Sequence, residues 1–139
     1  MPVIPYDEQN FAHLHGPDTA ACRRIARKLI RDAVVLLYRA NETNSHSLAL
    51  AWTDEAADYL HAAGKLLANE PKFDLLRLSA RLHNAILATF GHPNEGTLDA
   101  VADEAEKIAD TLAASEGKAQ QVARAVLAEA ERHVLEVDK

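Results

Sequence analysis

Apolar residues recur at three- and four-residue intervals along almost all of the last forty residues of the chain. At about 100° per residue such positions share one side of an α-helix, and this spacing excludes a strand. The residues that form this stripe are Leu98, Val101, Ala105, Ile108, Leu112, Ala119, Val122, Val126, Ala130, Val134 and Val137.

A glycine interrupts the stripe near its middle and leaves two interpretations open. Gly117, in the sequence Ser-Glu-Gly-Lys, costs about 1 kcal/mol inside a helix relative to alanine, which favours two helices with a break at this point. The stripe nevertheless keeps its phase across the glycine. One unbroken helix over residues 97–137 would span about 60 Å at about 1.5 Å per residue and would need a partner chain to cover it. We favour two helices, which makes five in all.

The same periodicity predicts three earlier helices. The first covers residues 18–40, with Asp18 or Thr19 as its N-cap. The second begins near Ser45, or later with Thr53 as its cap, and ends where the sequence reads Asn-Glu-Pro. The third covers residues 72–90 and is closed by a turn that contains Gly and Pro.

These elements predict an all-α fold, a mostly antiparallel four- or five-helix bundle with an irregular N-terminal arm. Residues 1–17 form the arm because Pro and Gly interrupt them, and residues 18–139 form a single helical domain. Thr97 is the expected N-cap of the final segment. The stretch 33–38 is apolar on nearly every side of the first helix, which predicts burial all round, either centrally or in a subunit contact.

Charge is distributed unevenly along a chain whose net charge is −6. The net charge argues against general binding to nucleic acid or to anionic membranes. A basic face on the first helix is the strongest polar feature and the candidate binding surface for phosphate, RNA or an acidic protein surface. The alternative is a solvated face partly neutralised by the acidic C-terminal segment. The basic face consists of Arg23, Arg24, Arg27, Lys28 and Arg31.

Composition bounds the compartment and the cofactors. Cys22 is the single cysteine, so no internal disulfide or cysteine-rich zinc site can form, and a reducing cytoplasm is compatible with that composition. The N-terminus does not read as a secretory signal, and no apolar run is long enough to cross a bilayer. We therefore expect a cytoplasmic protein that acts without membrane contact and without a cofactor.

Histidines supply the candidate buried polar site. His83 and Ser79 lie in the middle of the apolar side of the third helix, where a histidine needs a hydrogen-bond partner or loses its charge. The spacing of Asp58 and His61 is related to metal sites of helical bundles, but both fall on the solvated stripe of the second helix. No metal site and no catalytic residue is predicted.

Two Arg-to-His spacings, from Arg39 to His46 and from Arg77 to His83, resemble the signature of HEPN-type helical ribonucleases. In that family such a pair polarises an RNA phosphate at the nuclease centre of a dimer. Here Arg77 points about 120° away from His83 on a helical wheel, and a turn separates Arg39 from His46. The resemblance is therefore too loose to assign the chain to that family.

No complete catalytic constellation is present, and this absence guides the functional expectation. We expect a non-catalytic protein–protein interaction or regulatory module: an adaptor, an inhibitor or antitoxin-like binder, or a small assembly subunit. The alternatives are a HEPN-like ribonuclease or toxin and a metal-dependent helical-bundle enzyme. The apolar stretch 33–38 and the C-terminal stripe favour a protein partner and a homodimer.

Overall fold

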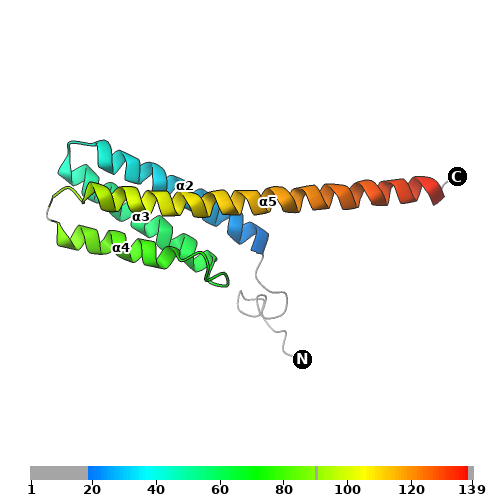
Figure 1. The fold of residues 1–139 in the computed structure, drawn as a ribbon, viewed down its shortest axis with the longest axis horizontal. Helices are drawn as coiled ribbons and strands as arrows, with labels where there is room; N and C mark the ends of the chain where they lie inside the picture. Colours follow the sequence, from blue (N-terminus) through cyan, green and yellow to red (C-terminus); the bar gives the residue numbers. More distant parts are fainter. Residues whose placement is uncertain (1–18, 90, 138–139) are drawn as a thin grey trace, which may run out of the picture.

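The computed structural model describes residues 19–89 and 91–137, and within them every regular element is a helix. The all-α prediction is therefore confirmed, while the predicted arm, residues 1–17, lies outside the described residues. Four helices follow one another along the chain (Figure 1). They are α2 (Thr19–Glu42), α3 (His46–Leu66), α4 (Leu75–Ala88) and α5 (Glu95–Val137).

Polar side chains fix the beginnings of three helices. Ser45 caps α3, as predicted, and its hydroxyl accepts a hydrogen bond from the backbone N–H of Leu48. Asp74 caps α4, so this helix begins three residues later than predicted. The side chain of Asn94 accepts from the backbone N–H of Thr97. Thr97 therefore lies inside α5, and its prediction as the N-cap is wrong.

Each helix of the bundle packs against two others. α2 contacts α3 and α5, and α4 contacts the same two helices from the other side. Small side chains at these contacts let the helices approach closely, and leucines fill the space between them. The largest fully buried apolar side chains are Ile30, Leu37, Leu60, Leu75, Leu78, Leu82, Leu98 and Leu112.

Polar contacts between α2 and α5 fix their relative direction. Arg27 pairs with Glu116, Arg31 with Asp110, and Asn41 with Asp99. Residue numbers that rise along α2 are therefore matched by numbers that fall along α5, so the two helices run in opposite directions.

The second half of α2 is not buried all round. Val34 is buried, but Val35 and Tyr38 are exposed on the outer side of α2. The hydroxyl of Tyr38 donates to Glu106 at 3.1 Å, which keeps this ring at the surface. Among the described residues no helix buries Val35 or Tyr38, so the predicted central position of this stretch is wrong, whereas its burial in a subunit contact stays a prediction.

The final segment is one helix, so the prediction of a break near Gly117 is wrong. α5 has 43 residues and spans about 65 Å at about 1.5 Å per residue. The ion pair between Arg27 and Glu116 fixes α5 to the bundle at the residue just before Gly117. A single glycine therefore does not outweigh the helical preference of its neighbours.

Hydropathy gives no sign of a spanning segment in this part of the chain. Among the described residues, no helix combines the length and the apolar character that a membrane crossing requires.

Candidate interaction surface

Half of α5 extends beyond the other helices (Figure 1). Residues 117–134, here called the projecting segment, are exposed at every position. The preceding half of the same helix packs on α2 and α4. The projecting segment is therefore helical without any contact from the rest of the described bundle that would bury it.

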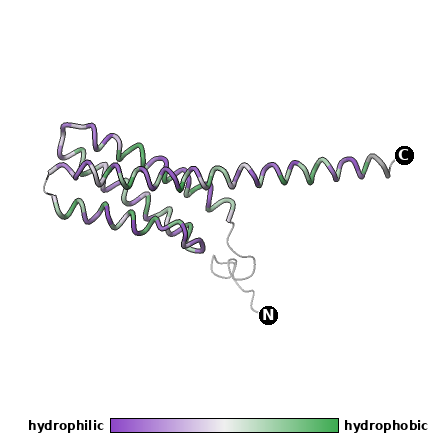
Figure 2. Tube along the Cα trace, viewed as in Figure 1, coloured by the Kyte–Doolittle hydropathy of each residue, from purple (hydrophilic) through white to green (hydrophobic). Residues whose placement is uncertain are grey.

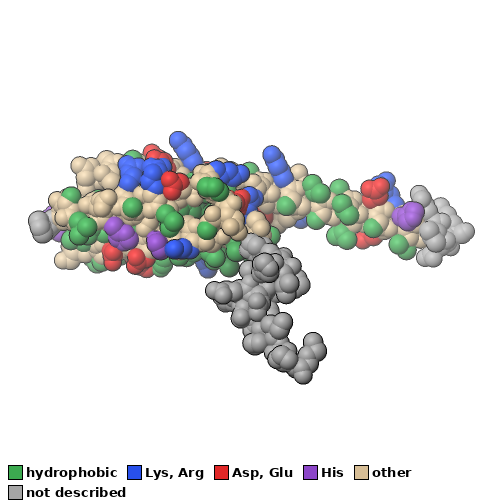
Figure 3. All heavy atoms as spheres, turned by 90° about the horizontal axis from the view of Figure 1, so that it is seen from below, with side chains coloured by type: hydrophobic (Ala, Val, Ile, Leu, Met, Phe, Trp, Pro, Cys, Tyr) green, Lys and Arg blue, Asp and Glu red, His purple; other side chains and the backbone are tan. Residues whose placement is uncertain are grey.

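The projecting segment carries an apolar stripe, called here the α5 stripe (Figures 2 and 3). The larger members, Val122, Val126, Leu127 and Val134, are 60–64% exposed. At about 100° per residue they lie on the side of the helix that buries Leu112 in the bundle. The complete stripe is Ala119, Val122, Ala123, Val126, Leu127, Ala130 and Val134.

Exposed apolar surface of this kind is unusual in a soluble protein. Single exposed apolar side chains are common, whereas a continuous row of them marks an interaction site. The opposite side of the segment is polar or small and includes Gln121, Ala128 and Arg132. The segment is thus amphipathic, like a helix that covers a core, but the described residues provide nothing for it to cover.

A cleft of about 260 Å³ lies where the stripe meets the bundle. On one side it is lined by the first residues of α2, Thr19 and Ala20 among them, and on the other by α5, from Leu112 to Ala119. Its lining is mainly apolar. The cleft is continuous with the α5 stripe, because Ala119 belongs to both.

The basic face predicted from the sequence is largely occupied by acidic partners from within the chain. Arg23 donates to Glu70 (Nε to Oε2, 3.0 Å), and this bond lowers the pKa of the Glu70 carboxyl and raises that of the Arg23 guanidinium. Arg27 pairs with Glu116, and Arg31 pairs with Asp110.

The two remaining members of the basic face, Arg24 and Lys28, are exposed. Intramolecular neutralisation, the alternative considered from the sequence, thus accounts for three of the five basic residues.

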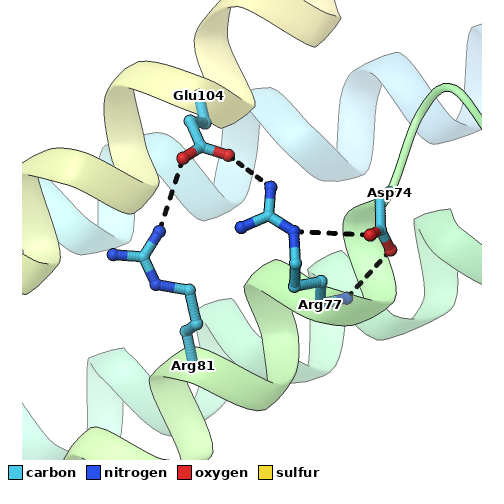
Figure 4. Close-up of polar contacts among 4 residues, drawn as sticks. All are labelled: Asp74, Arg77, Arg81 and Glu104. Atoms are coloured by element: carbon cyan, nitrogen blue, oxygen red, sulfur yellow. Dashed lines mark hydrogen bonds and ion pairs between the residues drawn. The ribbon is translucent and has the colours of Figure 1, made fainter.

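A second ionic network joins α4 to α5 (Figure 4). Glu104 of α5 accepts from Arg77 at 2.8 Å and from Arg81 at 3.4 Å, and Arg77 also reaches Asp74 at 3.3 Å. The hydrogen bond to Glu104 raises the pKa of Arg77. These contacts hold the first half of α5 on the bundle, so the direction of the projecting segment is set by the bundle.

Of the two predicted buried polar residues, only one is buried. Ser79 is fully buried, and its hydroxyl donates to the carbonyl of Ala57 at 2.8 Å. His83 is 43% exposed, so its predicted burial is wrong. Its Nε2 lies 3.8 Å from one carboxylate oxygen of Asp54 and of Asp58. His83 stays partly exposed because α4 lies against the edge of α3, where the polar stripe of α3 reaches the side chain of His83.

Asp54, Asp58 and His83 could together offer three ligand atoms to a divalent cation. Their donor atoms lie within 4.8 Å of one another, and both carboxylates are exposed to solvent. Such a surface trio leaves most of the coordination sphere to water. His61, the histidine singled out from the sequence, is exposed on the same side of α3 but is not part of this group.

The Arg and His residues of the nuclease-like spacings have separate surroundings. Arg77 faces Glu104 on α5, whereas His83 faces the two aspartates on α3. The ring of His46 contacts that of His92 edge-on, with 6.0 Å between centroids. The described contacts therefore do not join Arg77 and His83 into one catalytic pair.

Comparison with known proteins adds no relative. No protein-family model, no curated protein and no solved structure matches this chain.

The projecting segment is also the feature that sequence reasoning valued too little. The stripe already favours a protein partner from the sequence alone, but the predicted break at Gly117 gives no indication that it lies on a helix that extends beyond the bundle. The unbroken phase of the stripe, from Leu112 through Ala119 to Val126, was the signal that could have identified it.

Proposed function

We propose that this chain is a non-catalytic protein–protein interaction module that binds its partner through the α5 stripe. The observation that carries the proposal is the exposed apolar row on a helix that extends beyond its own bundle. In this proposal the bundle, with mostly antiparallel helices, is the rigid support, and the projecting segment is the binding element. The protein would act in the cytoplasm as an adaptor or a small assembly subunit.

The exposed apolar area of the α5 stripe is large enough to bind a partner. Complete burial of a Val or Leu side chain contributes about 1.5–3 kcal/mol. Since about 60% of each larger side chain of the stripe is exposed, covering one of them contributes about 1–2 kcal/mol, and covering all four about 4–8 kcal/mol. A partner helix that brings a similar stripe doubles this gain, which then offsets an association cost of about 4–15 kcal/mol.

The basic face is already largely paired within the chain, which leaves the α5 stripe as the main candidate for binding a partner. Because Arg23, Arg27 and Arg31 pair within the chain, the charged surface of the bundle is largely satisfied. Exposed ion pairs of this kind contribute about 0–1 kcal/mol each. The apolar stripe is therefore the larger source of binding free energy.

Site-specific photo-crosslinking in cells that produce the full chain tests this function. A photoreactive phenylalanine derivative replaces Val126, in the centre of the stripe, and the matched control carries it at Gln121 on the opposite side of the same helix. We expect irradiation to give a covalent protein adduct from position 126 and none from position 121. Absence of an adduct at 126, or equal adducts from both positions, would refute the proposal.

A further inference from the structure

The bundle itself shows what kind of helix the α5 stripe accepts. On the continuation of the same side of α5, Leu98, Val101, Ala105 and Leu112 are covered by the bundle. α2 runs there in the opposite direction to α5 and begins at Thr19, beside the cleft. An antiparallel helix that continued the line of α2 outward would therefore cover the stripe with the packing that the chain already uses.

A second copy of α5 matches the stripe in this orientation. With residues 119–134 of the two copies antiparallel and overlapped end to end, Ala119 lies opposite Val134 of the second copy, and Ala123 lies opposite its Ala130. Val126 lies beside Leu127 of the second copy, close to the two-fold axis. These apolar positions thus meet apolar positions, and the alanines among them allow the helices to approach closely.

Charges on the flank of the stripe agree with this register. Arg124 and Glu131 lie on the same flank, about 20° apart on the helical wheel. In an antiparallel pair the same flanks of the two helices meet, so Arg124 of each copy faces Glu131 of the other. A parallel pair would instead set the positive first halves of the two segments, which contain Lys118 and Arg124, at the same level.

The ends of the segment fit the same arrangement. In this register the last turn of the second α5 arrives at the cleft formed by Thr19, Ala20 and Leu112. Its C-terminal end would approach the N-terminal end of α2, an orientation that the helix dipoles favour. A parallel partner would have to continue into the space that α2 occupies, because α2 covers this side of α5 just before residue 117.

We propose that the occupant of the α5 stripe is a second copy of this chain, packed antiparallel across Val126 and Leu127, so that the protein is a two-fold dimer with a bundle at each end. This inference rests on the proposed function and names its partner. The dimer is isologous, since the same surface serves both copies.

Disulfide trapping on the purified full chain tests both the partner and the direction. In a Cys22→Ser background, Ala119→Cys and Val134→Cys are prepared as separate proteins, mixed and oxidised. We expect the mixture to give a cross-linked species that contains one chain of each kind, and each protein alone to stay largely uncross-linked. Self-cross-linking of Ala119→Cys alone would show a parallel pair and overturn the proposal.

Sedimentation of the otherwise unchanged chain supplies the second readout. We expect twice the mass of the 15.2 kDa chain at micromolar concentration. Val126→Glu should raise the dissociation constant at least 100-fold, and the control Gln121→Glu should leave it unchanged. The bundle should stay folded in both variants, because neither residue contacts it, and circular dichroism checks this.

The two proposals fail separately in these experiments. A chain that sediments as a monomer at every concentration, but whose position 126 cross-links to a different protein in cells, would overturn the dimer and retain the interaction function. A monomer that gives no adduct at position 126 would overturn both.

Discussion

Gly117 is the point at which the continuity of α5 can be tested with a single methyl group. Apart from its chain neighbours and the backbone of its own helix, a Cβ placed on Gly117 would meet no atom within 4 Å, so alanine fits there without any adjustment. Alanine is better than glycine inside a helix by about 1 kcal/mol. Because the residue lies where α5 leaves the bundle, this gain stabilises the helical form of everything that follows it.

The size of the effect follows from the state of the projecting segment. A helix of about twenty residues without a packed partner is marginal in water, so its helical and frayed forms are close in free energy. A gain of about 1 kcal/mol shifts that balance about fivefold. In Gly117→Ala we therefore expect the backbone amides of residues 118–134 to exchange about fivefold more slowly, measured at concentrations low enough for isolated chains.

Gly64 provides the matched control within the bundle. A Cβ at this position would lie 2.8 Å from Cδ2 and 3.2 Å from the backbone nitrogen of Leu76. The backbone of α4 cannot move away without disturbing its packing, and overpacking of this kind costs about 1–3 kcal/mol. Gly64→Ala should therefore lower the free energy of unfolding in urea, although it makes the same change in helix propensity.

One outcome at Gly117 would contradict this reasoning directly. If Gly117→Ala accelerated exchange beyond residue 117, or reduced the helical signal in circular dichroism, the native backbone at this position would be non-helical. α5 would then consist of two helices, and the register argued for the dimer would lose its basis.

Two further predictions concern the bundle. Arg23 holds the pKa of Glu70 below its ordinary 4.5, so this carboxylate contributes stability above pH 4.5 and loses that contribution as the pH falls through the depressed pKa. In urea unfolding between pH 7 and pH 3, the free energy of unfolding of Glu70→Gln should therefore fall less steeply with pH than that of the unchanged chain. Equal pH dependence in the two proteins would exclude the linkage. Ser79→Ala removes a buried hydrogen bond to Ala57 and should lower the free energy of unfolding by about 1 kcal/mol, whereas an unchanged urea midpoint would mean that the bond contributes nothing.

Periodicity was sufficient for the fold class and for most helix positions, since it reports directly which side of a helix is apolar. Ser45 could be recognised as a cap because the preference for serine there is local. Asp74 and Asn94 were missed as caps, although both residue types are favoured there. Their helices were placed by apolar spacing, which does not define an end within a turn.

The break predicted at Gly117 failed for a different reason. Helix propensity is a small local term, and it was weighed against a stripe whose phase was unbroken over many turns. A loop would preserve that phase only by coincidence, whereas a continuous helix preserves it automatically. The stripe was therefore the stronger evidence.

The exposure of His83 could not be predicted from the local sequence pattern. The apolar spacing of α4 placed it on the buried side, and Ser79 one turn earlier is indeed buried. Whether the next turn is also covered depends on which side of α3 lies against α4, a matter of three-dimensional packing. The same is true of Arg23 and Arg31, whose acidic partners lie 47 and 79 residues away in the chain.

The ion pairs and the stripe together explain why a helix can extend so far from its bundle. Arg27 holds Glu116 immediately before Gly117, and Glu104 binds two arginines further back, so α5 is fixed to the bundle up to the residue where it leaves. These contacts orient the projecting segment but cannot keep it helical along its length. In the proposed dimer that stability comes from burial of the stripe. Of the helices described, α5 itself has the length and the apolar pattern to supply the second surface.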